Sequence, residues 1–222
     1  MSSSRVLFRF AKKGEARHLS HRDLMRAFER ALRRAGLPVR MSQGFNPHPK
    51  LSILAALPVG VEADAEALEV AFEPPVGAEE ARERLAAQLP PGLSLSEATT
   101  LPEGERAQAA AAAYEVQLPP DARLSQADVR RFLERASIPV RRGDGAESVE
   151  FDLRPGLRAL EVAGRTLRFV LAAEGSPAPK PADVLAALLG IGPADAARMR
   201  LRRTVLLLAG SQGNGTTEKQ LC

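Results

Sequence analysis

The residues best suited to chemistry gather in one loop, residues 42–50, which reads SQGFNPHPK. Histidine side chains can exchange protons near neutral pH, so His48 could serve as a general acid or base, with the cation of Lys50 or of Arg17 beside it. His21, in the segment before the loop, is a second candidate for the same role. These residue types would suit a metal-independent ribonuclease. The sequence leaves open whether His48, His21 or Lys50 is catalytic.

The same loop is also suited to binding. Gly44 permits a positive φ or a close backbone approach, and Pro47 and Pro49 restrict the path of the chain. The hydrogen-bond donors that this stiffened loop offers are Asn46, His48 and Lys50. Phe45 has two interpretations. Its ring either packs into the core as part of a rigid turn, or it offers a stacking face to an unpaired base.

A basic amphipathic helix is predicted directly before the loop. Ser20 is a good N-cap, and Asp23 places negative charge in the first turn. Apolar residues at helical spacing fall within an arc of about 140°. These are Leu24, Ala27, Phe28, Ala31, Leu32 and Ala35. Arginines occupy a separate arc of about 120°. These are Arg22, Arg26, Arg30, Arg33 and Arg34, with Arg17 just before the helix. Gly36 is the expected C-cap, and Pro38 prevents continuation.

The charge distribution supports a polyanion as the partner of this helix. Residues 1–50 carry twelve Lys or Arg against three Asp or Glu, a net charge of +9. The other 172 residues carry nineteen against twenty-four, a net charge of −5. Guanidinium groups on one face can contact phosphates, bidentately where the geometry allows. We therefore expect an RNA-binding surface. The alternative is a solvated arginine face that pairs with acids elsewhere in the chain.

The sequence predicts neither a metal nor a cofactor. His18 and His21 have His-x-x-His spacing, but no carboxylate or cysteine that would complete a metal site is evident. The single cysteine, Cys222, is the last residue, so the chain cannot supply the three cysteines of a radical SAM cluster. The sequence contains no Walker A motif, no G-x-S-x-G motif, and no G-x-G-x-x-G motif that opens a helix after a strand. The N-terminus lacks the apolar region of a signal peptide, and no apolar run reaches about 20 residues. We therefore expect a cytoplasmic protein.

The order of predicted elements indicates an α+β fold. Strand, helix, strand, strand, helix and strand follow one another in residues 1–100, and the same order returns in residues 114–209 with an expanded middle. We expect two tandem ferredoxin-like (βαββαβ) halves with antiparallel sheets. Short strands are expected at residues 37–42 and 114–118. Residues 101–113 are the expected linker, and residues 210–222 the expected disordered tail. Asp64, Glu66 and Glu69 look like surface acids.

One long string resembles a known family. Residues 8–62, which include SHRDLMRAFERALRRAGLP and GFNPHPK, resemble the start of the radical SAM-linked protein family, and the likeness extends to KPADVLAALLG and RRTVLLL near the C-terminus. Two departures stand out. His18 and Arg22 occupy positions where the family tends to have apolar residues, and Ser-Ile-Leu at 52–54 replaces a more usual Ser-Phe-Ala. Members of this uncharacterised family stand alone or are fused to a radical SAM protein. The resemblance therefore implies a radical SAM enzyme as a partner in trans.

Three functions are compatible with these observations. The first is an RNA-binding accessory protein that presents tRNA or rRNA to a radical SAM enzyme for modification. The second is a metal-independent endoribonuclease. Tandem halves with a basic first helix are analogous to the CRISPR repeat-processing endoribonucleases, although a shared fold does not fix a function. The third is a protein-interaction adaptor that binds no nucleic acid.

Overall fold

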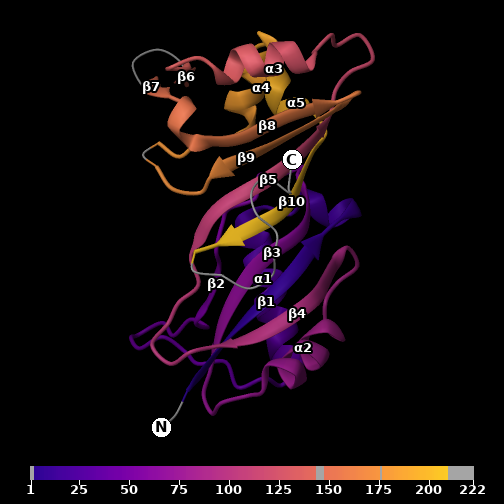
Figure 1. Ribbon diagram of the computed structural model, residues 1–222. Coiled ribbons are helices and arrows are strands. Elements are labelled where there is room, and N and C mark those ends of the chain that lie inside the picture. The colour runs from indigo at the N-terminus through magenta and orange to yellow at the C-terminus, as the bar shows by residue number, and fades with distance from the viewer. Residues whose placement is uncertain (1–2, 144–147, 176, 210–222) are drawn as a thin grey trace. The chain divides into compact units, whose positions relative to one another are not determined.

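The structure is a computed structural model that describes residues 3–143, 148–175 and 177–209. The expected disordered tail, residues 210–222, lies outside these residues. The chain divides into two compact units, Met1–Gln108 and Ala109–Cys222. Figure 1 labels the elements of each unit along the chain.

The first unit contains a four-stranded antiparallel sheet. Its elements in chain order are β1 (Ser4–Lys12), the 3-10 helix η1 (Gly14–His18), α1 (His21–Arg34), β2 (Leu51–Ile53), β3 (Glu62–Phe72), α2 (Ala78–Ala86) and β4 (Leu93–Leu101). β1 pairs with β3 and β4, and β2 pairs with β3, all antiparallel. The strand order is therefore β4-β1-β3-β2. β1 and β3 are the inner strands, so the residues that they bury form the centre of the core.

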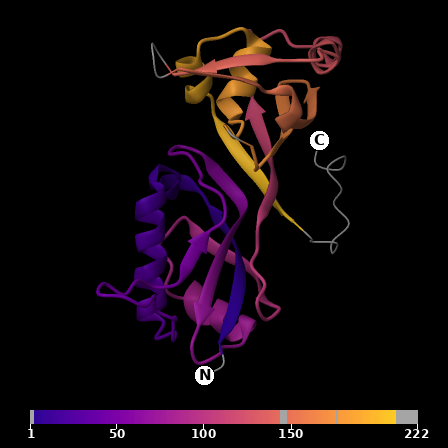
Figure 2. The same ribbon diagram turned by 90° about the vertical axis from the view of Figure 1, so that its left-hand side faces the viewer.

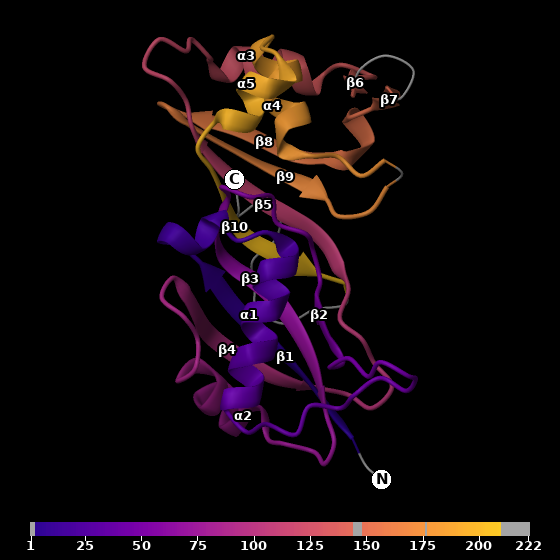
Figure 3. The same ribbon diagram turned by 180° about the vertical axis from the view of Figure 1, so that it is seen from behind.

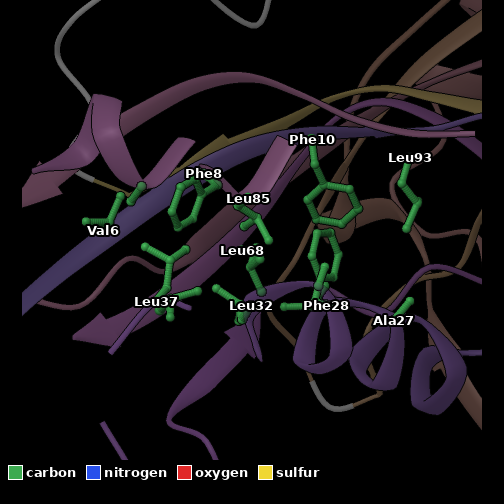
Figure 4. Close-up of a cluster of buried hydrophobic side chains, with 14 of the residues drawn as sticks. Val6, Phe8, Phe10, Ala27, Phe28, Leu32, Leu37, Leu68, Leu85 and Leu93 are labelled. Carbon is green, nitrogen blue, oxygen red and sulfur yellow. The ribbon is translucent and has the colours of Figure 1, made fainter. Parts of the chain in front are cut away.

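Both helices of this unit cover the same face of the sheet, as Figures 2 and 3 show. Alternate residues of β1 point to that face, and Phe8 and Phe10 are fully buried there. The ring of Phe10 meets the ring of Phe28 from α1 edge to face, with 5.0 Å between centroids. Leu85 of α2 packs into the same cluster (Figure 4). Edge-to-face pairs of this kind add to the free energy of burial. They fix α1 on the sheet.

Charged residues are buried beneath the start of α1 and on β3. Lys12 is completely buried, and its Nζ donates to the carbonyl oxygens of Arg17 (3.1 Å) and Leu19 (3.3 Å), which lead into α1. Glu66 and Glu69 are buried as well, so the prediction that they are surface acids was wrong. Glu69 accepts from Arg5 Nη1 (2.8 Å) and from the Ala107 amide (3.0 Å). Because these partners satisfy its carboxylate, Glu69 can be buried on the sheet.

The second unit has a sheet with a similar strand order. Its elements are β5 (Ala109–Gln117), α3 (Gln126–Leu133), β6 (Pro139–Arg142), β7 (Val149–Asp152), the 3-10 helix η3 (Arg154–Gly156), β8 (Leu157–Ala163), β9 (Thr166–Ala172), α4 (Pro181–Leu189), α5 (Pro193–Arg198) and β10 (Leu201–Leu208). β5 pairs with β10 and β9, and β9 pairs with β8, all antiparallel. β6 and β7 form a separate two-stranded ribbon.

A row of alternating charges crosses all four strands of this sheet. Arg202 donates to Glu115 (2.8 Å), Glu115 accepts from Arg168 Nε (3.0 Å), and Arg168 Nη1 donates to Glu161 (3.3 Å). The bonds to Glu115 and then Glu161 raise the pKa of Arg168. Opposite charges on adjacent strands favour one strand register over its neighbours.

The predicted α+β class is confirmed, with mostly antiparallel strand pairing, and two short segments differ from the prediction. β4 runs to Leu101 and β5 begins at Ala109, so residues 109–113, expected in the linker, belong to a strand. Alanine has a low strand propensity, but these five residues lie between β9 and β10, where pairing and burial outweigh propensity. In the segment expected as a strand at residues 37–42, only Val39 and Met41 form isolated bridges.

Phe28→Ala should destabilise the protein by about 3–5 kcal/mol, because it removes a fully buried ring and leaves a cavity against Phe10. Chemical denaturation followed by circular dichroism measures the change. Arg30→Ala on the exposed side of the same helix is the matched control and should change stability by less than about 0.5 kcal/mol. A loss below about 1 kcal/mol for Phe28→Ala would contradict the role of this ring in anchoring α1.

Candidate nucleic-acid interface

The ends of α1 are fixed by local hydrogen bonds. Ser20 is the N-cap, and its hydroxyl accepts from the Asp23 amide (3.2 Å) and donates to Asp23 Oδ2 (2.6 Å). That hydrogen bond, with further help from the charges of Arg26 and Arg22, lowers the pKa of Asp23. The structure places the C-cap at Ala35, one residue before the expected Gly36. Gly36 follows with φ of +61° and ends the helix in a left-handed turn.

The arginine face of α1 points away from the core. Its members Arg22, Arg26, Arg30, Arg33 and Arg34 are all exposed, whereas the apolar residues of the helix are buried. Arg34 donates to the carbonyl oxygen of Gln88, and Arg26 lies 3.8 Å from Asp23. Among the described residues, the side chains of Arg22, Arg30 and Arg33 have neither an ion pair nor a hydrogen bond. The helix therefore presents cations that the described part of the chain does not neutralise.

Arg17, which was expected to bind RNA together with these arginines, already forms contacts with neighbouring side chains. It is half-buried in η1, with Nη1 3.8 Å from Glu62 Oε1 and with Nε donating to His18 Nε2 (3.1 Å). Its carbonyl oxygen accepts from Lys12 and from the Gly60 amide. Arg17 is thus a weaker candidate for phosphate contact than the arginines of α1.

The loop at residues 41–49 rises from a closed ring of backbone hydrogen bonds. The Lys50 amide donates to Arg40 O (2.8 Å), the Arg40 amide donates to Ala71 O (2.8 Å), and the Ala71 amide donates to Lys50 O (2.9 Å). Above this ring, Ser42 and His48 are joined twice. The Ser42 amide donates to His48 O (2.7 Å), and the His48 amide donates to Ser42 Oγ (2.8 Å). The two arms of the loop are therefore tied to each other and to β3.

The tip of the loop carries an aromatic ring into solvent. Phe45 has a relative accessibility of 107 %, so the interpretation that it packs into the core is wrong. Gly44 precedes it with φ of +135°, a conformation that favours glycine. Asn46 and Pro47 are exposed beside it.

The candidate catalytic residues are placed separately. His48 is exposed with its backbone bonded to Ser42, and Lys50 is half-buried at the base of the loop. His21 is exposed. It is the first residue of α1, ahead of the turns that pack on the sheet. The described residues contain no group of three or more His, Cys, Asp or Glu in a metal-binding arrangement.

α1 and the loop extend to the same side of the sheet in the first unit (Figure 2). The loop leaves the sheet beside β2 and projects to one side of α1, as the view from behind also shows (Figure 3). The helix that carries the exposed arginines and the loop that carries the exposed Phe45 thus extend to one side of this unit. Such a combination can hold a phosphate backbone and stack on a base.

One feature of the second unit was not foreseen from the sequence. A pocket of about 620 Å³ lies between the segment after β5 and the end of α4 with α5. Its polar lining includes Asp121, Arg123 and Asp195, and its apolar lining includes Leu188 and Met199. The residues come from segments far apart in the chain and have no shared spacing, so no sequence motif could have indicated it.

Within the described ranges, no helix is both long and apolar enough to cross a membrane. The family described as an uncharacterized protein conserved in bacteria (DUF2344) matches residues 5–181. The match includes α1, the loop and most of the second unit, through β9. No curated protein matches the chain.

Ser20→Ala should destabilise α1 by about 1 kcal/mol at neutral pH, since it removes the N-cap. It should also raise the pKa of Asp23 towards its ordinary value of 3.8. The lowered pKa of Asp23 stabilises the folded state while its carboxyl is ionised. As the pH falls and this carboxyl becomes protonated, the difference in stability between wild type and Ser20→Ala should therefore become smaller. Denaturation at several pH values and NMR titration of the Asp23 carboxyl measure both effects. Ser20→Thr, which keeps the hydroxyl, is the control. An unchanged pKa in Ser20→Ala would contradict the assignment.

Proposed function

The chain belongs to the bacterial family DUF2344, and from that premise we propose that it is an RNA-binding accessory protein. In this function it presents tRNA or rRNA to a radical SAM enzyme, which carries out the modification in trans. The single cysteine of the chain means that the partner must supply the iron–sulfur cluster.

We also propose that each unit is a ferredoxin-like half. In both units the last strand pairs with the first strand, which pairs on its other side with the third of the four strands. In the first unit this order is β4-β1-β3-β2, and in the second it is β10-β5-β9-β8. The ribbon of β6 and β7 would then be an insertion in the second half. Repetition of this order supports an internal duplication.

The observation that carries the RNA proposal is the exposure of the arginines on α1 and the lack of ion pairs, within the described residues, at three of them. Arg22, Arg30 and Arg33 are exposed, and no acid in the described residues pairs with them. By contrast, arginines elsewhere in the chain, such as Arg82 and Arg84, form ion pairs with acids on their own helix. A helix face on which three exposed arginines have no ion pair within the described residues attracts a polyanion, and each phosphate that it contacts adds to a salt-dependent affinity.

The loop would complete this surface. Asn46 and His48 can donate to phosphate, sugar or base edges, and Lys50 adds charge at the base of the loop. Gly44, Pro47 and Pro49 would shape it. The partner enzyme follows from the resemblance of the sequence to the radical SAM-linked family, so its identity is an extension of the RNA proposal.

The triple variant Arg26→Glu, Arg30→Glu and Arg33→Glu should weaken RNA binding on the order of 100-fold, taking about 1 kcal/mol for each lost contact. The slope of log affinity against log salt should fall by roughly 2 to 3, because each phosphate contact contributes about 0.7–0.9. Fluorescence anisotropy with labelled tRNA, measured over a range of salt concentrations, tests both values.

A matched control reverses three exposed arginines of the second unit, Arg123, Arg130 and Arg200, and changes the net charge equally. This control should keep most of the affinity. Equal affinity in wild type and the α1 triple variant would refute the proposal, and an equal loss in both variants would reduce it to a general charge effect. RNA that stays intact with the protein in EDTA separates binding from ribonuclease activity. Cleavage abolished by His48→Ala would favour the endoribonuclease.

A further inference from the structure

We propose that the RNA bound by this surface carries an unpaired nucleotide, and that the ring of Phe45 stacks on its base. This inference rests on the proposed function and adds the class of RNA that the site selects. In this arrangement the arginines of α1 hold the flanking backbone, and the loop at residues 41–49 reads the exposed base.

The first support is the complete exposure of Phe45. A phenylalanine side chain that remains in water does not contribute the substantial free energy that its burial would give to folding. At 107 % relative accessibility, Phe45 has no packing role in the described fold. The turn itself is made by Gly44 and by the hydrogen bonds of Ser42 and His48, so it does not need an aromatic residue. A ligand that covers the ring accounts for a phenylalanine at this position.

The second support is the surroundings of the ring. A protein-binding hot spot lies within an apolar patch that excludes water. Around Phe45 the exposed residues of the tip are Gln43, Gly44, Asn46 and Pro47, and the nearest exposed large apolar residue in sequence is Met41, at 45 %. A single flat ring among amide groups matches a nucleobase, which has a flat apolar face and polar edges.

The third support is the rigidity of the loop base. Three backbone hydrogen bonds join Arg40, Lys50 and Ala71, and two more join Ser42 to His48. Because the arms are held before the ligand arrives, less conformational entropy is lost when the ring stacks. The bases of a continuous duplex are already stacked on one another, so only an unpaired nucleotide in a loop, bulge or end can meet the ring.

The chain contains no tryptophan, which allows a direct test. Phe45→Trp keeps an aromatic ring and creates a single fluorophore at the tip. Val59→Trp, at another exposed apolar residue of the first unit (60 %), is the matched control. The two RNA ligands are a continuous duplex and the same duplex with one unpaired nucleotide. Circular dichroism verifies that each variant is folded.

The wild type should bind the interrupted duplex more tightly, and Phe45→Ala should lose about 5- to 150-fold for that ligand only. Phe45→Trp should restore the preference and show fluorescence quenching, whereas Val59→Trp should show none. Equal affinity of Phe45→Ala and wild type for the interrupted duplex would overturn this inference and leave the RNA proposal intact. No binding of either RNA by the wild type would overturn the proposed function itself. A blue shift of Phe45→Trp with phosphatidylglycerol vesicles, without quenching by RNA, would overturn the inference in favour of a membrane ligand.

Discussion

The packing of α1 against β1 is the interaction on which the proposed surface depends. Phe28 and Phe10 meet in the centre of the core, and the apolar residues on either side of Phe28 are buried with it. Once that face of the helix is fixed on the sheet, the arginines must face solvent, because the two sets occupy different arcs of one cylinder. Lys12 stabilises the segment just before α1, because its buried ammonium group donates hydrogen bonds to two carbonyl oxygens there.

The surface thus combines two parts with different physical origins. The cationic part comes from a helix whose orientation is set by hydrophobic burial, which does not depend on charge screening. Its attraction for a polyanion is electrostatic and therefore sensitive to salt. The aromatic part comes from a loop held by backbone hydrogen bonds. In the proposed function, one part supplies affinity and the other supplies selection between RNAs.

The helix could be predicted from the sequence almost completely, and the loop only in part. Ser20, the periodic apolar residues and Gly36 are local signals, so they placed α1 to within a residue or two of its observed ends. The position of Phe45 depends on Ala71, a residue of β3 that is distant in sequence and supplies both backbone groups to the loop base. No pattern within residues 42–50 reports that contact.

The same limit applies to buried charge. Glu66 and Glu69 lie among apolar residues of β3 and looked like surface acids, but every residue from 66 to 72 is buried, so both faces of that part of the strand are covered. For Glu69, the partners are Arg5 and the Ala107 amide, which lie far away along the chain. The start of β5 could not be predicted, because its five alanines resemble a linker or a helix in composition.

The hydrogen-bonded ring of Arg40, Lys50 and Ala71 separates the tip of the loop from the rest of the molecule. All backbone bonds that tie the loop to β3 lie below Met41 and Pro49, and the exposed tip packs on neither helix nor sheet. Residues 43–47 can therefore be replaced by a segment of another length or composition at little cost to folding. The closed base makes this site a natural graft point, where a foreign recognition peptide could be carried by a scaffold that stays unchanged.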